Sequence, residues 1–237
     1  MKLGKLFIPR NVQLMVFDMA GTTVNEGGLV YKTLYNTIKN FGLLIEEEEI
    51  KNWHGSNKYE VMDYFYTNRG IGHGLKTDLF NQFDNNLLYE YNKEGNIELI
   101  DKDMPDLFNT FRKERNIKIA LNTGYSKDLQ ETIVNSLGMR DFVDDFISSE
   151  SVKYGRPYPY MILELMKRNG VENVENVVKV GDTPNDILEG LNAKCLMSIG
   201  VLSGASDEET LVEAGASRVI DSVMNIDPEP YPSGKNI

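Results

Sequence analysis

Residues 14–23 read Leu-Met-Val-Phe-Asp-Met-Ala-Gly-Thr-Thr. An apolar run that ends before a glycine turn predicts a short buried strand, and Asp18 stands at the carboxyl end of that strand. Open α/β sheets bind their ligands outside the carboxyl ends of the strands, so Asp18 is a candidate functional residue. A turn-forming or helix-capping aspartate would give the same local pattern, and the rest of the chain must decide between these readings.

Three later segments carry related patterns. A strand-like run at residues 116–121 leads into Asn-Thr-Gly-Tyr at 122–125, and residues 153–159 read Lys-Tyr-Gly-Arg-Pro-Tyr-Pro. Residues 177–186 read Val-Val-Lys-Val-Gly-Asp-Thr-Pro-Asn-Asp. This order of a nucleophilic acid, a hydroxyl, a basic residue and an acidic loop resembles the haloacid dehalogenase superfamily. The four motifs together span residues 18–186, which is most of the chain.

Details of the motifs narrow the resemblance. Most phosphatases of the superfamily have a second aspartate where this chain has Ala20, and a lysine where it has Arg156. Asp-x-Ala-Gly-Thr-Thr together with Gly-Arg-Pro looks like the phosphonatase (phosphonoacetaldehyde hydrolase-like) family, whose cap domain carries Gly-x-x-Lys, here residues 55–58. Two positions depart from that family: its histidine after the lysine is Val61 here, and its cysteine after the nucleophile is Gly28.

Alternating strand-like and helix-like segments predict a doubly wound α/β fold with a mostly parallel sheet. The helices predicted around this sheet include residues 128–137 and 160–168, each followed by a glycine stop signal. The predicted strands are residues 12–17, 118–122, 142–147, 177–180, 196–201 and 218–220.

The segment between the first two motifs breaks this alternation. It shows no convincing strand, and residues 29–41, 46–53, 59–68 and 78–91 all read as helices. We therefore expect a helical cap at 27–104, inserted into an α/β hydrolase core formed by residues 1–26 and 105–237. Residues 27–28 and 102–105 would be its hinges, and the proline-containing tail from Asp227 is expected to be extended or disordered.

The resemblance implies a reaction at phosphorus. Asp18 would attack as the nucleophile and form an aspartyl-phosphate, which divides one difficult step into two. A cofactor Mg²⁺ would be held by Asp18, the backbone carbonyl of Ala20 and Asp182, with Asp186 supporting through water, because hard oxygen ligands suit this ion. The alternative for Asp182 and Asp186 is helix capping.

The remaining phosphate and substrate contacts follow from the same resemblance. Arg156 would pair with the phosphoryl group and with Asp18, whose pKa it would lower; a surface salt bridge is its alternative. The residues expected to bind phosphate or substrate are Thr22, Thr123, the backbone N–H of Gly124, Tyr125 and Arg156.

Lys58 bears on which bond is cleaved. In phosphonatases the cap lysine forms a Schiff base with the substrate aldehyde, so that the carbon–phosphorus bond can break with an enamine as the leaving group. Such a lysine needs a neutral amine, which burial beside cations favours. The alternative is a solvated lysine on a cap helix. His54 lies near Lys58 in the chain and would most simply be structural.

Composition limits the class of protein. The 237 residues carry a net charge of −11 and 41% hydrophobic residues, as in an acidic globular enzyme rather than a nucleic-acid-binding protein. No apolar run approaches the length of a membrane span, and the single Cys195 favours the reducing cytoplasm. The expected partner is a small phosphorylated or phosphonate metabolite, and neither a nucleic acid nor a membrane is expected. A homodimer is left open.

The motifs and the family they resemble together imply a Mg²⁺-dependent hydrolase acting on a small phosphonate or phosphate. The first alternative is a phosphomonoester phosphatase of the phosphoglycolate type that uses no Schiff base, in which Lys58 or water would protonate the leaving oxygen. A phosphomutase is disfavoured, because it needs the acid–base aspartate that Ala20 replaces. A binding protein on a decayed hydrolase scaffold is opposed by the intact Asp18, Thr123, Arg156 and Asp182.

Overall fold

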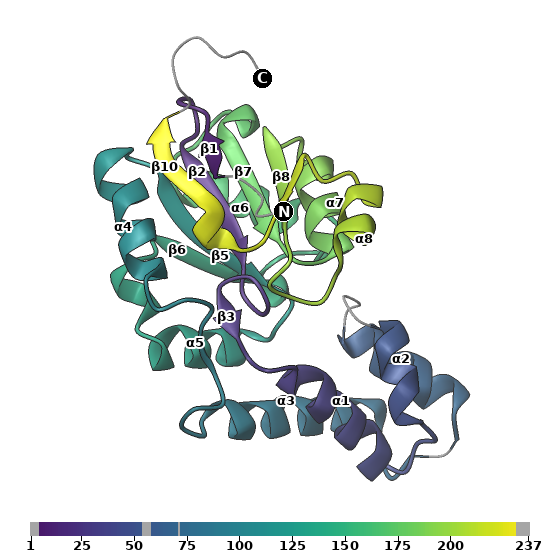
Figure 1. Cartoon of the computed structure of the whole chain (residues 1–237). Coiled ribbons are helices and arrows are strands. Elements are labelled where there is room, and N and C mark those ends of the chain that lie inside the picture. Colours follow the sequence, from purple (N-terminus) through teal and green to yellow (C-terminus); the bar gives the residue numbers. More distant parts are fainter. Residues whose placement is uncertain (1–4, 54–57, 71, 231–237) are drawn as a thin grey trace.

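The centre of the computed structural model is a six-stranded parallel sheet with the strand order β6-β5-β2-β7-β8-β9 (Figure 1). The structure describes residues 5–53, 58–70 and 72–230. All six predicted strands are present and the doubly wound prediction is confirmed. The strands are β2 (Leu14–Asp18), β5 (Lys118–Thr123), β6 (Asp145–Ser148), β7 (Val177–Gly181), β8 (Met197–Val201) and β9 (Arg218–Ile220).

Helices cover both faces of the sheet, and the alternation of side chains along β2 shows why. Met15 and Phe17 belong to the same apolar cluster as residues of α4 and α5, whereas Leu14 and Val16 pack in a second cluster with residues of α6 and α7. Successive side chains of a strand point to opposite faces, so a continuous apolar run requires cover on both. The helices are α4 (Met104–Glu114), α5 (Lys127–Ser136), α6 (Tyr160–Arg168), α7 (Pro184–Ala193) and α8 (Glu208–Glu213).

Three α-helices lie beyond the carboxyl ends of the strands, outside the sheet (Figure 1). They are α1 (Leu29–Asn40), α2 (Lys58–Asn68) and α3 (Lys76–Tyr91). The helix predicted at 46–53 is a 3-10 helix over Glu47–Trp53. At its start, Glu49 N donates to the carbonyl oxygen of Glu46, three residues earlier, at 3.0 Å. That residues 27–104 form a separate cap remains our prediction.

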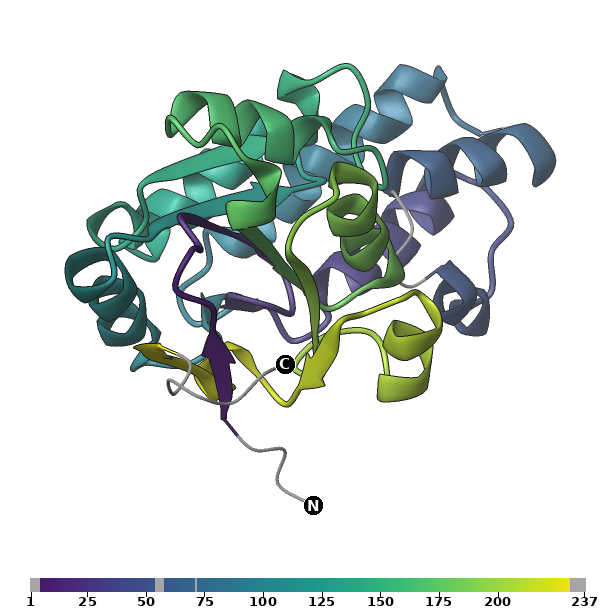
Figure 2. The same cartoon turned by 90° about the horizontal axis from the view of Figure 1, so that it is seen from above.

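Two small strand pairs escaped the sequence reading. β3 (Val24–Asn25) pairs antiparallel with β4 (Glu98–Leu99), so the expectation of no strand between the first two motifs is wrong at Glu98–Leu99. β1 (Leu6–Ile8) pairs parallel with β10 (Ile226–Pro230), on the side of the molecule away from the α1–α3 helices (Figure 2). Strands of two or three residues carry too little periodicity to be recognised.

The tail from Asp227 is extended as far as Pro230, and residues 231–237 lie outside the described part of the chain. Arg115 contributes to holding this strand, because it donates hydrogen bonds to the backbone carbonyls of Pro228 and Ile8. Among the described helices, none combines the length and the apolar character needed to cross a membrane.

Candidate active site

The candidate site lies where the carboxyl ends of three neighbouring strands meet. In the register of the sheet Asp18 of β2 stands opposite Asn122 of β5, and Asp182 follows directly after β7. A cavity of about 410 Å³ opens at this edge, with Asp18 and Asp182 in its wall. Parallel strands deliver their terminal residues to one edge, and the predicted motifs therefore converge.

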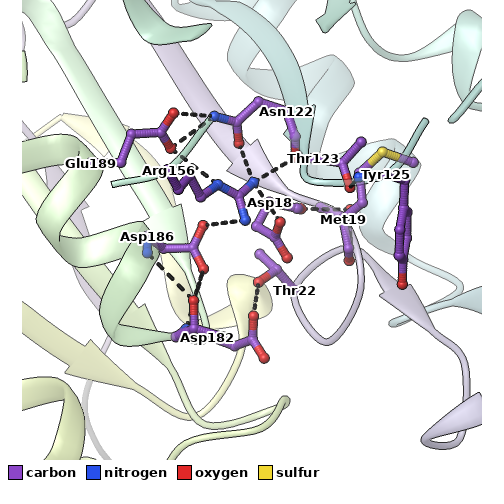
Figure 3. Close-up of polar contacts among 12 residues, drawn as sticks. Asp18, Met19, Thr22, Asn122, Thr123, Tyr125, Arg156, Asp182, Asp186 and Glu189 are labelled. Carbon is purple, nitrogen blue, oxygen red and sulfur yellow. Dashed lines mark hydrogen bonds and ion pairs between the residues drawn. The ribbon is translucent and has the colours of Figure 1, made fainter. Parts of the chain in front are cut away.

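Arg156 connects Asp18 to two further buried acids, Asp186 and Glu189 (Figure 3). Its Nη2 lies 2.6 Å from Asp18 Oδ1 and its Nη1 lies 3.0 Å from Asp186 Oδ1. Its Nε lies 3.3 Å from Glu189 Oε2, an ion-pair contact without hydrogen-bond alignment. Nη2 also donates to the backbone carbonyl of Asn122 at 2.9 Å. The surface alternative for Arg156 is wrong, since a buried guanidinium is shared among three carboxylates.

The ionisation of Asp18 differs from our expectation. Burial raises the pKa of the Asp18 carboxyl, and this effect outweighs the lowering by Arg156, so the net shift is upward. Burial alone lowers the pKa of the Arg156 guanidinium, but Asp18, Asp186 and Glu189 raise it above its ordinary value. The arginine is therefore a fixed positive charge beside Asp18, and a bound cation would add to its lowering effect on the pKa of Asp18.

A second layer of polar residues lies beneath these acids and was not identified from the sequence. Lys179 of β7 is fully buried, and its Nζ lies 2.8 Å from Asp186 Oδ1 and 3.0 Å from Asn122 Oδ1. Asn122 Nδ2 donates to both carboxylate oxygens of Glu189 at 2.9 Å. The one available signal was a lysine within an otherwise apolar strand, because such a residue must find partners in the interior.

Asp186 occupies the first turn of α7 and belongs mainly to this layer. Thr183 caps the helix, and its hydroxyl donates to Asp186 Oδ2 at 2.6 Å. Burial alone raises the pKa of Asp186, but Arg156 and Lys179 outweigh it, so the net shift is downward. The capping alternative therefore describes Asp186, while its support of the cation through water stays a prediction.

The donor set suits a hard divalent cation. Asp18, Asp182 and Asp186 each offer a carboxylate oxygen, and these oxygens lie within 4.8 Å of one another. Burial, with the charges of Asp18 and Asp186, raises the pKa of Asp182 to about 8, and a cation bound among these oxygens would act against that rise. Ala20 lines the same cavity. The residues therefore fit the Mg²⁺ site that the sequence predicted.

Two glycines allow Asp182 its position. A Cβ built on Gly204 would fall 2.0 Å from Asp182 Oδ2, and one on Gly21 would fall 2.6 Å from the same atom. Gly21 also has a φ of 80°, in the left-handed region that favours glycine. The backbone N–H of Ala205 donates to Asp182 Oδ2 at 2.7 Å. The loop at residues 203–205 was not identified from the sequence.

The predicted phosphate-binding residues divide into two groups. Thr123, Gly124 and Tyr125 line the cavity. Thr22 is fully buried, and its hydroxyl donates to Asp182 Oδ1 at 3.4 Å, whereas it is Thr23 that donates to the backbone carbonyl of Asp18 at 2.9 Å. Thr22 therefore contacts the predicted metal ligand Asp182, and its predicted contact with phosphate or substrate stays a prediction.

Lys58, at the start of α2, lines the same cavity as Asp18. Its Nζ donates to the Tyr31 hydroxyl at 3.2 Å and lies 4.5 Å from the centroid of the Tyr31 ring. Val61 is fully buried in the apolar cluster, while Gly28 lines the cavity with open space where a side chain would stand. His54 and residues 55–57 of the Gly-x-x-Lys segment lie outside the described residues.

A buried carboxyl group near Lys58 was also not identified. Glu26 follows β3 and receives hydrogen bonds from the hydroxyls of Tyr91, at the end of α3, and Tyr125, the latter at 3.4 Å. The two hydroxyls lie 3.0 Å from each other. Burial raises the pKa of Glu26, although both tyrosines and Lys58 act to lower it. Next to two glycines, Glu26 reads in the sequence as an ordinary turn residue.

Comparison with known proteins identifies the same family as the motifs do. The model of the haloacid dehalogenase-like hydrolase family matches residues 12–194. A phosphonoacetaldehyde hydrolase of Latilactobacillus sakei is 29% identical over 215 residues, covering 83% of this chain and 77% of that protein. A phosphonoacetaldehyde hydrolase of Bacillus cereus is 27% identical over 232 residues, covering 92% of this chain and 83% of its own length.

Solved structures show the same fold. A phosphonoacetaldehyde hydrolase-like protein from Oleispira antarctica superposes with a TM-score of 0.76 at 23% identity, covering 94% of this chain and 92% of that one. A predicted phosphoglycolate phosphatase from Haemophilus somnus gives a TM-score of 0.74 at 17% identity, covering 90% and 95%. The sequence relatives favour the phosphonatase-like subgroup, which similarity in fold alone does not identify. The chain belongs to the haloacid dehalogenase-like hydrolase family and is a phosphonatase-like member of it.

Proposed function

We propose that this hydrolase cleaves a small phosphonate or phosphate monoester through an aspartyl-phosphate on Asp18. One observation carries the proposal: Asp18 lies in the wall of a cavity of about 410 Å³, bound to Arg156 and grouped with Asp182 and Asp186. A cavity of this size suits a small ligand. The phosphonate and phosphate names of the relatives agree with this substrate class.

Two displacements at phosphorus complete the reaction. An Asp18 oxygen forms a bond to phosphorus while the bond to the leaving group breaks, and water then attacks the aspartyl-phosphate to release phosphate. Thr123 and the N–H of Gly124 bind phosphoryl oxygens, and Arg156 orients Asp18 and offsets the phosphate charge. Mg²⁺, held by Asp18, the Ala20 carbonyl and Asp182 with Asp186 in support, supplies further neutralisation of the phosphoryl oxygens when bound.

If the substrate is a phosphonate aldehyde, Lys58 would form a covalent imine with it before the carbon–phosphorus bond breaks. Its amine condenses with the aldehyde of the substrate and water is lost, which gives an imine. When the carbon–phosphorus bond breaks, its electron pair moves into the imine and forms an enamine, and protonation with hydrolysis then restores the amine. The position of Lys58 in the wall of the same cavity as Asp18 supports this route.

Phosphate ester hydrolysis without a Schiff base is the second candidate. Lys58 Nζ lies 4.5 Å from the centroid of the Tyr31 ring, the kind of contact through which an aromatic face attracts a cation. The lack of polar side chains at Gly28 and Val61 also separates this chain from the phosphonatase pattern. In this route Lys58 would contact the leaving group as a cation.

A release assay tests the proposal. Small phosphonates and phosphate esters are incubated with the enzyme and Mg²⁺, and inorganic phosphate is measured. Asp18→Asn should lower the rate by about three orders of magnitude or more, because the amide is not a nucleophile. Asp144→Asn is the matched control, since Asp144 also pairs with an arginine, Arg112 at 3.1 Å, but lies where β5 and β6 begin. Equal rates for wild type and Asp18→Asn would overturn the assignment.

A further inference from the structure

Among the described residues of the cavity wall, no aspartate stands at the position of the superfamily's usual acid–base group. Cleavage of an alkyl phosphate ester releases a strongly basic oxygen, so it is assisted by an acid that protonates this oxygen. Ala20 stands where most phosphatases of the superfamily have an acid–base aspartate. Gly28 has no side chain, and Val61 is apolar and buried. In an ester hydrolase of this kind, another side chain or water would therefore provide the proton.

Most titratable side chains in the described cavity wall have other functions. Asp18 is the proposed nucleophile, Asp182 belongs to the cation group, and the Arg156 guanidinium stays charged. Burial and the charge of Glu26 hold the pKa of Tyr125 well above its ordinary range. The residues still to be considered are Glu26, Lys58 and Tyr31, and the last two are hydrogen-bonded to each other.

Glu26 lies in the cavity wall with its carboxyl group held in place. It is 9% exposed and lines the same cavity as Asp18 and Lys58. Tyr91 from α3 and Tyr125 from the loop after β5 both donate to its Oε2, which fixes the carboxyl group from two sides. The charges of both Glu26 and Asp18 act on the Tyr125 hydroxyl, so this phenol is within electrostatic reach of both acids.

We propose that Glu26 is the general acid that protonates the leaving oxygen of a phosphate ester, with Tyr91 and Tyr125 as its positioning residues. The inference rests on the proposed function in its ester form. An Asp18 oxygen bonds to phosphorus, the phosphorus–oxygen ester bond breaks, and the Glu26 proton passes to the departing oxygen, which leaves as an alcohol. Solvent water then returns a proton to the Glu26 carboxylate.

Burial favours this role, because it raises the pKa of Glu26 and so keeps more of the group protonated. The charged and titratable groups that act on Glu26 are Lys58 from α2, Tyr91 from α3 and Tyr125 from the core. Tyr31 of α1 acts in turn on Tyr91.

The dependence on the leaving group tests the inference. Glu26→Gln is assayed with glycerol phosphate, whose alkoxide needs a proton, and with 4-nitrophenyl phosphate, whose phenolate leaves without one. We expect kcat/KM to fall by about 100-fold or more for the alkyl ester and by less than about threefold for the aryl ester. Glu98→Gln is the matched control, because Glu98 bonds Asn25 in the same strand pair but does not line the cavity, and it should leave both values unchanged.

The pH dependence of the wild-type rate gives an independent test, which does not require that a variant folds. The rate with glycerol phosphate should decline as the pH rises and Glu26 loses its proton, while the rate with 4-nitrophenyl phosphate should show no matching decline. An equal loss on both esters in Glu26→Gln, or identical pH profiles in wild type, would overturn the inference and leave the proposed function intact. A wild type that releases phosphate from phosphonates alone would also overturn it. The absence of release from any phosphonate or ester would instead refute the proposed function.

Discussion

Lys179 and Asp186 form an ion pair of 2.8 Å in which neither side chain has any exposed surface. The same Asp186 oxygen lies 3.0 Å from Arg156 Nη1, and the guanidinium of Arg156 also pairs with the proposed nucleophile Asp18. One guanidinium therefore connects the buried Lys179–Asp186 pair to Asp18. Burying such charges costs free energy that only close partners offset. The site therefore depends on a lysine that does not contact the cavity.

Replacing this lysine should lower stability sharply. Lys179→Met removes the cation between Asp186 and Glu189, and breaking a buried pair from one side costs about 3–5 kcal/mol of unfolding free energy. Lys118→Met is the matched control, because Lys118 pairs with Asp144 at 3.3 Å but is nearly half exposed, and its loss should cost about 1 kcal/mol or less. Urea unfolding measures both values, and equal losses would contradict the buried role.

Cation binding should be visible without turnover. Mg²⁺ at about 100 times its dissociation constant should stabilise the wild type by about 2.7 kcal/mol in thermal or urea unfolding. Asp182→Asn should largely lose this stabilisation, because it removes a charged oxygen ligand. Activity of the wild type should disappear in excess EDTA and return with Mg²⁺. Full stabilisation of Asp182→Asn would show that the ion binds elsewhere.

Lys58 distinguishes the two candidate reactions. If carbon–phosphorus cleavage is the reaction, borohydride with an aldehyde substrate should trap an adduct on Lys58, and Lys58→Arg should be almost inactive because a guanidinium forms no such imine. Lys39→Arg is the matched control, since Lys39 also contacts a tyrosine, Tyr35 at 3.0 Å, on an exposed face of α1. Turnover of esters without an adduct, together with an active Lys58→Arg, would favour the phosphatase.

Glu26 should give stability its own dependence on pH. Its pKa is raised in the folded state above the ordinary 4.5, so the unfolded chain releases this proton first as the pH rises. The stability that protonated Glu26 contributes is therefore complete below about pH 4.5 and is lost as the pH passes the folded value. The unfolding free energy of the wild type minus that of Glu26→Gln should show this decline when it is measured across pH. A difference that does not vary with pH would contradict the raised pKa.

The sequence was most informative where one strand or helix carries its own signal. Six apolar runs predicted the sheet, and the polar residues at the ends of three of them predicted where Asp18, Thr123 and Asp182 meet. The direction of the Asp18 pKa could not be predicted in this way. It depends on how completely the neighbouring elements exclude water, and a motif does not carry that quantity.

Contacts between distant segments account for the other omissions. Glu26, Tyr91 and Tyr125 come from three different elements, and each looks ordinary in its own surroundings. Likewise, Asn122 and Glu189 are joined across 67 positions of the chain, and no local periodicity marks either of them. Such groups become visible only when the packing of the elements is known.

The short β3–β4 pair has a consequence for how this enzyme can be altered. Asn25 and Glu98 are direct partners in that pair, so the segment between them begins and ends at adjacent points. A segment whose two ends lie side by side can be exchanged as a module, because its replacement needs only neighbouring termini and leaves the strands undisturbed. Under the proposed function, the phosphoryl chemistry at Asp18 and the selection of the leaving group by Glu26 and Lys58 are thus open to separate redesign, with a transplanted module supplying a new selectivity to the same reaction.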